Sequence, residues 1–126
     1  MLGTHFRISL RNGAGSSGTY TVKAKFFKFA SDGSVEWDST ERTLMNAVSI
    51  GAGAWGNGSA FDNSSTKWVG ADLRVECSTS LAHQVTVQRQ VSTDGGSTYP
   101  SDGYGVGVGT IVAPSAATPN AGLRML

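Results

Sequence analysis

The sequence predicts an all-β protein, an antiparallel β-sandwich of jelly-roll-like type. We expect one domain over residues 1–113, followed by an extended C-terminal arm over residues 114–126. Apolar and polar residues alternate with a period of two along most of the chain, and helical periodicity is absent. Turn residues separate the alternating runs. The length of 126 residues suits a single hydrophobic core.

The composition favours an ordered, turn-rich domain. There are 17 glycines, about twice the usual ~7%, and charged residues make up only 15%. Three Trp, three Tyr and five Phe, with few charges, are unlike a disordered chain. The net charge of +1 gives no clustered positive surface for phosphates, so nucleic acid is not an expected partner.

The single cysteine, Cys77, excludes an internal disulfide, and alternation in "LRVECST" predicts that its thiol is buried. The first residues lack the features of a secretory signal, and no apolar run approaches the ~20 residues that span a bilayer. We therefore expect a protein made in a reducing cytoplasm, with no membrane partner.

The first half of the chain contains two alternating runs and one clear turn. "THFRISL" and "TYTVKAKFFKF" read as strands, and the doublet Phe26–Phe27 shifts the phase of the second run. Such a shift predicts a β-bulge or a strand that passes between sheets. "SDGS" (31–34) predicts a hairpin turn. Beyond it, Val35 and Trp37 share one face of a strand, with Glu36 and Asp38 on the other.

Residues 51–65 predict a long Gly- and Asn-rich loop, which contains Trp55 and Phe61. These aromatics either form a platform for a sugar, or close one end of the sandwich or contact a subunit. Two strands follow, "TKWVGADLRVECSTS" and "HQVTVQRQV", and parity points Arg89 inward. The predicted core residues are Phe6, Ile8, Val22, Trp68, Leu73, Val75, Val85 and Val87.

The segment "VSTDGGSTYPSDG" (91–103) contains a recognisable motif. It resembles the Asp-box of sialidase-type β-propellers, S-x-D-x-G-x-T-aromatic, at Ser92, Asp94, Gly96, Thr98 and Tyr99. One copy in 126 residues cannot build a propeller of several blades of roughly 40–50 residues each. The motif therefore predicts a self-stabilised turn in which the Asp94 carboxylate accepts hydrogen bonds from backbone N–H groups.

"GYGVGVG" (103–109) places glycine at alternate positions, so one face of the predicted strand has no side chains. Such a face predicts close approach by an aromatic side chain of the same fold or by a neighbouring subunit. The arm ends in Leu123, Met125 and Leu126. It is either frayed or docks these residues on a partner, and in both cases its deletion would leave the domain's stability nearly unchanged.

The sequence predicts neither an enzyme, nor a metal site, nor a cofactor. Most carboxylates lie in predicted turns or, like Asp38, at strand positions that we expect to face solvent. His5, His83 and Cys77 are not at metal-ligand spacing. Glu36 and Asp38 form a carboxylate pair on one strand face, but we do not expect it to be catalytic, and no phosphate-binding loop or nucleophile elbow is apparent.

Three segments carry a family resemblance: "FRISLRNGAG", "YTVKAKFFKFASDGSVEW" and "QVTVQRQVSTDGGSTYPSDGYGVGVGTI". Together they cover most of residues 5–112 and resemble small β-rich structural proteins of tailed bacteriophages. The resemblance implies a virion protein made in the host cytoplasm. It would be a capsid decoration (cement) protein that bridges major capsid protein subunits at the capsid surface.

The same resemblance implies a symmetric homo-oligomer, a trimer or dimer. The alternatives are a small tail or head–tail (neck) protein, or a carbohydrate-binding module for host attachment.

Overall fold

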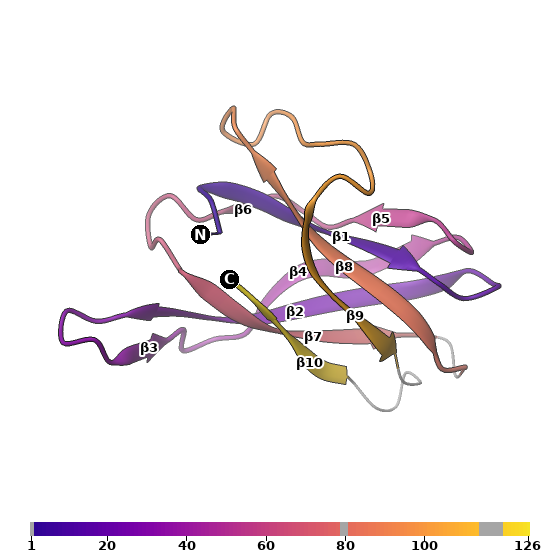
Figure 1. Ribbon diagram of the computed structural model, residues 1–126, viewed down its shortest axis with the longest axis horizontal. Coiled ribbons are helices and arrows are strands. Elements are labelled where there is room, and N and C mark those ends of the chain that lie inside the picture. The colour runs from indigo at the N-terminus through magenta and orange to yellow at the C-terminus, as the bar shows by residue number, and fades with distance from the viewer. Residues whose placement is uncertain (1, 79–80, 114–119) are drawn as a thin grey trace.

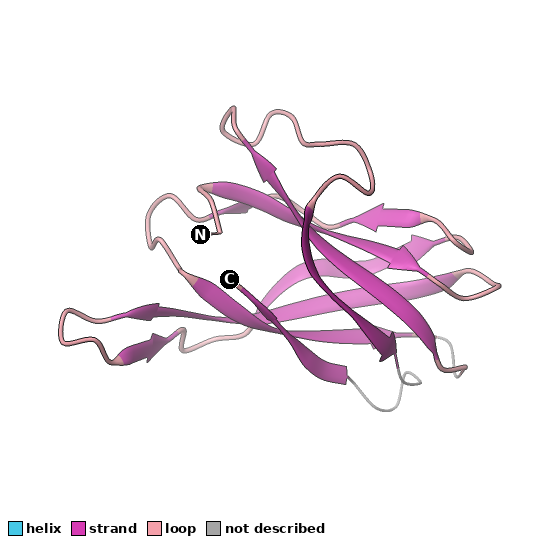
Figure 2. Ribbon diagram, in the orientation of Figure 1, coloured by secondary structure: helices cyan, strands magenta, loops and turns pink. Residues whose placement is uncertain are grey.

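The computed structural model describes residues 2–78, 81–113 and 120–126, and within them it contains ten β-strands and no helix (Figures 1 and 2). Two sheets of five strands each lie face to face, and every strand pairing is antiparallel. The predicted antiparallel β-sandwich is therefore confirmed. The jelly-roll type stays a prediction.

Sheet A has the strand order β5-β1-β8-β9, and β6 also pairs with β1. Its strands are β1 (His5–Asn12), β5 (Trp55–Asn57), β6 (Phe61–Asp62), β8 (His83–Ser92) and β9 (Val106–Ala113). Sheet B has the order β10-β7-β2-β3, and β4 also pairs with β2. Its strands are β2 (Gly18–Phe29), β3 (Val35–Trp37), β4 (Arg42–Ile50), β7 (Gly70–Cys77) and β10 (Asn120–Met125).

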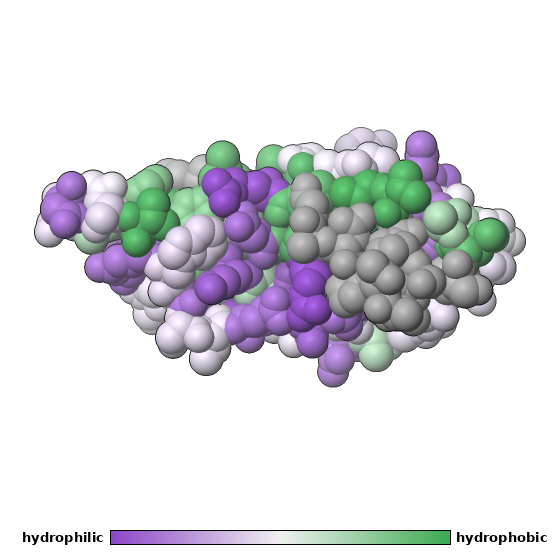
Figure 3. Space-filling model, turned by 90° about the horizontal axis from the view of Figure 1, so that it is seen from below, coloured by the Kyte–Doolittle hydropathy of each residue, from purple (hydrophilic) through white to green (hydrophobic). Residues whose placement is uncertain are grey.

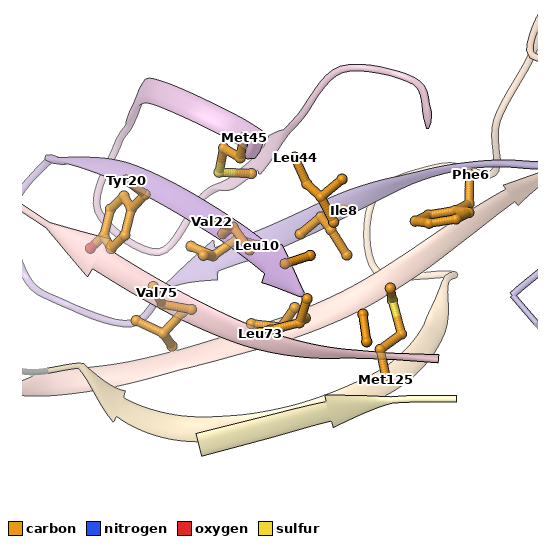
Figure 4. Packing of buried hydrophobic residues seen from close by; sticks show 14 of the residues in the cluster. Phe6, Ile8, Leu10, Tyr20, Val22, Leu44, Met45, Leu73, Val75 and Met125 are labelled. Carbon is orange, nitrogen blue, oxygen red and sulfur yellow. The ribbon is translucent and has the colours of Figure 1, made fainter. Parts of the chain in front are cut away.

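The core lies between the sheets, where the inward residues of β1, β2, β7 and β8 meet (Figure 4). Seven of the eight predicted core residues are buried: Phe6, Ile8, Val22, Leu73, Val75, Val85 and Val87. The eighth, Trp68, is half-buried and packs against the core from its edge. Arg89 is buried as parity predicted, and its Nη1 donates to the Leu126 carbonyl oxygen at 2.8 Å.

The β-bulge predicted at Phe26–Phe27 is wrong. The pairing of β2 with β7 runs in unbroken register from Tyr20 to Phe27, and the irregularities of β2 lie against β4, between Tyr20 and Lys23. Phe26 points into the core, whereas Phe27 lies on the outer face of sheet B under the Trp37 ring. Two consecutive buried residues therefore occupy opposite faces of one regular strand.

The long loop predicted over residues 51–65 contains two short strands. Trp55 in β5 pairs with Arg11, and Phe61 in β6 pairs with Phe6, so both strands extend sheet A along the edge of β1. Gly58, between them, approaches β4 so closely that an added Cβ would lie 2.1 Å from the Leu44 carbonyl oxygen. This contact closes one side of the sandwich.

The glycine-rich segment has no single covering group. Strand β9 begins only at Val106, and a bulge against β8 breaks the alternation between Gly107 and Gly109. Gly109 lies under Leu123, whose Cδ2 would be 2.6 Å from an added Cβ. The close neighbour at this glycine is thus an aliphatic side chain of the same chain, not an aromatic one.

The prediction of an extended arm is wrong for residues 120–126. Strand β10 pairs with β7 and forms one edge of sheet B. Met125 is 1% exposed within the core, and Leu123 packs against it (Figure 4). Both residues therefore stabilise the chain's own fold. The predicted arm's residues 114–119 lie outside the described residues.

Candidate functional site

The Asp-box-like motif, residues 92–99, forms one compact turn at the end of β8. The Asp94 Oδ1 accepts hydrogen bonds from the Ser97 and Thr98 N–H groups at 3.1 and 2.9 Å, and from the Ser92 hydroxyl at 2.6 Å. The Thr98 hydroxyl donates to Oδ2 at 2.5 Å. Gly95 and Gly96 adopt φ angles of 74° and 93°, which glycine reaches without steric cost. The carboxylate thus organises the turn's own backbone.

These donors also determine the protonation of Asp94. The hydroxyls of Ser92 and Thr98, followed by the Thr98 N–H group, hold the pKa of its carboxyl well below the usual range. The charged carboxylate accepts four hydrogen bonds from the turn itself, so its interactions serve the motif's own conformation. The motif's geometry explains a hairpin and gives no support to glycosidase chemistry.

Replacement of Asp94 by alanine is expected to loosen this turn. Because the Ser97 and Thr98 amides lose their acceptor, their hydrogen-exchange protection factors should fall, whereas those in β8 should not change. Since folding lowers the Asp94 pKa, the carboxylate contributes stability above its unfolded pKa of about 3.9. That contribution is lost only as the pH falls through the lower pKa of the folded state.

The matched control is Asp94→Asn, which keeps the oxygen that accepts both amides and should retain most of their protection. NMR-detected exchange from pH 6 down to strongly acid solution measures all three proteins. Equal protection of Ser97 and Thr98 in the alanine variant would contradict this account of the turn.

Tyr99 folds back over the outer face of sheet A. The Arg7 guanidinium lies 4.4 Å from the centre of the Tyr99 ring, and its Nε donates to the Gln90 side-chain oxygen at 2.7 Å. Gln90 in turn donates to the carbonyl oxygens of Pro100 and Ser101. The loop after the motif therefore packs over this face of sheet A.

Trp55 and Phe61, predicted as a sugar platform or an end closure, do not lie together. Their partners on β1 are Arg11 and Phe6, five residues apart, which is about 17 Å along a strand. Phe61 stacks on Phe26 at 4.7 Å and closes one end of the core. Trp55 lies against the Gly103 turn. The two rings do not share a surface on which a sugar could stack.

The carboxylates and histidines also serve structural contacts. Asp38, expected to face solvent, is buried; burial alone would raise its pKa, but the Arg42 side chain at 2.8 Å and the Thr40 N–H outweigh this and lower it. The Tyr20 hydroxyl lies 2.6 Å from His83 Nε2 inside the sandwich, and burial raises the pKa of Tyr20 to about 12.

No three His, Cys, Asp or Glu side chains within the described ranges are placed to hold a metal ion. The part of the chain that the structure describes also contains no helix that could cross a membrane.

The surface that stands out is one that sequence reasoning did not identify. The β2–β3 hairpin projects from the end of the sandwich (Figures 1 and 2, left). One of its faces carries apolar side chains. We define this hairpin face as Phe27, Phe29, Val35 and Trp37. Phe27 pairs with Trp37 and Phe29 pairs with Val35, so the four side chains lie in two neighbouring rows.

Three members of the hairpin face are exposed: Phe29 by 59%, Val35 by 48% and Trp37 by 41%. Phe27 is covered by its neighbours, with ring centres 5.1 Å from Trp37 and 6.2 Å from Phe29. Viewed from the side of sheet B, hydrophobic surface appears on the hairpin, whereas hydrophilic residues dominate the neighbouring middle of the sheet (Figure 3). In the sequence, the signal for this face is the apolar residue at every second position on both sides of the "SDGS" turn.

Leu126 alone of the three predicted C-terminal contact residues is exposed, and it lies beside Phe27 over Gly70. It therefore continues the apolar surface of the hairpin face toward β10.

No protein-family model matches the chain, and comparison with curated proteins and with solved structures gives no significant match.

Proposed function

We propose that this chain is a structural protein of a tailed-bacteriophage virion, a decoration protein that binds and bridges major capsid protein subunits on the capsid surface. The observation that carries the proposal is the exposed hairpin face. Contiguous exposed apolar side chains on a soluble domain are typical of protein-binding surfaces. The titratable groups described above serve the fold, so contact, not chemistry, is the activity that the geometry supports best.

Two properties of the sequence support the same proposal. The segments quoted above resemble phage structural proteins, and the net charge of +1 avoids strong repulsion between many copies held close together. A capsid offers the same site many times, so weak contacts on a bridging protein are multiplied by multivalency. A homo-oligomer, a trimer or dimer, would increase this effect.

A position in the tail or neck would use the same kind of contact and is the second candidate. The carbohydrate-binding alternative loses its basis, because Trp55 and Phe61 lie apart and Phe61 belongs to the aromatic packing of the core.

Electron cryo-microscopy of particles from a phage with and without the gene tests the proposal. We expect density at repeated positions on the capsid surface of the complete particles, large enough to hold the β-sandwich. This density should be absent from the deletion particles. Density confined to the neck or tail would move the protein to the second candidate. Absence of the protein from purified particles would make the structural proposal wrong.

A further inference from the structure

We infer that the hairpin face is the surface that contacts the capsid, and that its partner is an apolar segment of a capsid subunit flanked by carboxylates. This inference rests on the proposed function for the identity of the partner. The face itself is defined by the geometry of β2 and β3. Its size, its charge and its position each bear on what covers it.

The exposed part of the hairpin face is small. Aromatic side chains bury about 150–250 Å² each, so three half-exposed side chains offer on the order of 300 Å². A stable interface needs roughly 800 Å² on each partner. A dimer of two copies joined only through this face would therefore be weak, whereas a projecting hairpin that enters a groove of a larger partner could bury more of its surface.

Lys25 brings a positive charge to the edge of the face, and its cross-strand neighbour Asp72 on β7 is bound to Arg124. Lys25 extends over the Trp37 ring, with its Nζ 5.7 Å from the ring centre. No described carboxylate lies within 4.0 Å of that ammonium group, the limit for an ion pair. A partner with carboxylates beside its apolar segment would complement Lys25.

The other cations near the face are already matched. Arg124, whose guanidinium lies 5.3 Å from the centre of the Phe27 ring, donates to both Asp72 carboxylate oxygens at 2.7 and 3.1 Å. Lys28, the neighbour of Phe27 and Phe29 in β2, pairs with Glu36 at 3.8 Å. Two copies that met through this face would thus each bring a Lys25 that has no ion pair. The hairpin's own carboxylate without a cation, Asp32, lies at the turn, where it accepts from Ser34. The small exposed area therefore remains the main argument against a second copy as the occupant.

The position of the face suits insertion. The hairpin extends beyond the packed part of the sandwich, and its turn is held by the Asp32 side chain, which accepts from the Ser34 N–H at 2.9 Å and the Ser34 hydroxyl at 2.6 Å (Figure 1). Gly33 supplies the positive φ angle of 85° that the turn needs. A turn fixed in this way presents the face with little loss of conformational freedom on binding.

Binding of the purified protein to capsids from the deletion phage tests the inference. The double variant Phe29→Ser/Val35→Ser is expected to bind about a hundredfold more weakly than the native chain, because two apolar contacts are lost. The variant Lys25→Glu should weaken binding at low salt, and this loss should shrink as salt is added.

The matched controls replace an exposed valine and an exposed cation that lie outside the β2–β3 hairpin. Val106→Ser removes a valine that is 50% exposed on β9, and Arg11→Glu reverses an exposed cation on β1 in sheet A; both should bind as the native chain does. Thermal unfolding of each variant verifies that it is folded. Sedimentation should show the same oligomeric state for native protein and double variant.

Three outcomes separate the claims. If native protein binds and the double variant binds equally well, the hairpin face is not the contact and only this inference is wrong. If the double variant changes the oligomeric state, the occupant is a second copy and the inference is overturned. If the native chain does not bind deletion capsids, the proposed function is wrong, and so is the inference that the partner is a capsid subunit.

Discussion

Removal of residues 120–126 is expected to lower the free energy of unfolding by about 3–7 kcal/mol, a large part of a small domain's stability. Met125 is 1% exposed in the core, and truncation of such a residue costs about 2–5 kcal/mol. Leu123 adds the packing over Gly109, and β10 adds its ladder with β7. Urea unfolding of the chain that ends at residue 119 measures the loss.

Two single variants localise this effect on the strand. Met125→Ala should account for much of the destabilisation, because its side chain faces the core. Arg124→Ala, one residue away on the outer face, loses an exposed ion pair with Asp72 and should cost less than about 1 kcal/mol. An unchanged urea midpoint after the deletion would mean that the chain ends in an arm, as the sequence alone suggested.

The strands that periodicity identified are those that are long and have one face in the core. In β1, β2, β7 and β8 apolar side chains alternate over most of the strand, so local pattern and final structure agree. The strands that it missed, β5, β6 and β10, are short and owe their conformation to pairing with β1 or β7. Such pairing joins residues far apart in the chain and leaves little trace in local alternation.

The same contrast between local and long-range interactions explains which candidate sites could be predicted from the sequence. The hydrogen bonds of the Asp-box-like turn join residues within the motif, so its geometry could be anticipated from eight consecutive residues. The hairpin face required knowledge of which side of β2 meets the second sheet. The sequence shows Phe26 and Phe27 as equivalent neighbours, and only the packing assigns Phe26 to the core and Phe27 to the outer face.

The division of β2 into two faces leads to the second large effect, the replacement of Phe26 by alanine. Phe26 is completely buried and lies at the centre of an aromatic cluster, with ring centres 4.7 Å from Phe61, 6.1 Å from Trp68 and 6.2 Å from Phe6. Truncation of a buried phenylalanine to alanine costs about 3–5 kcal/mol, because packing is lost and a cavity remains.

The matched control for this variant is Phe29→Ala, three residues along the same strand. Phe29 is exposed by 59%, so its truncation should change the free energy of unfolding by no more than about 0.5 kcal/mol, as at most surface positions. Urea unfolding compares the two variants with the native protein. Since Phe61 reaches the cluster from β6, loss of Phe26 should also release this end of sheet A, and amide exchange near Phe61 should become faster. Equal stabilities of the two alanine variants would show that the faces of β2 are not divided between core and surface, and the assignment of the hairpin face as a binding surface would fail with it.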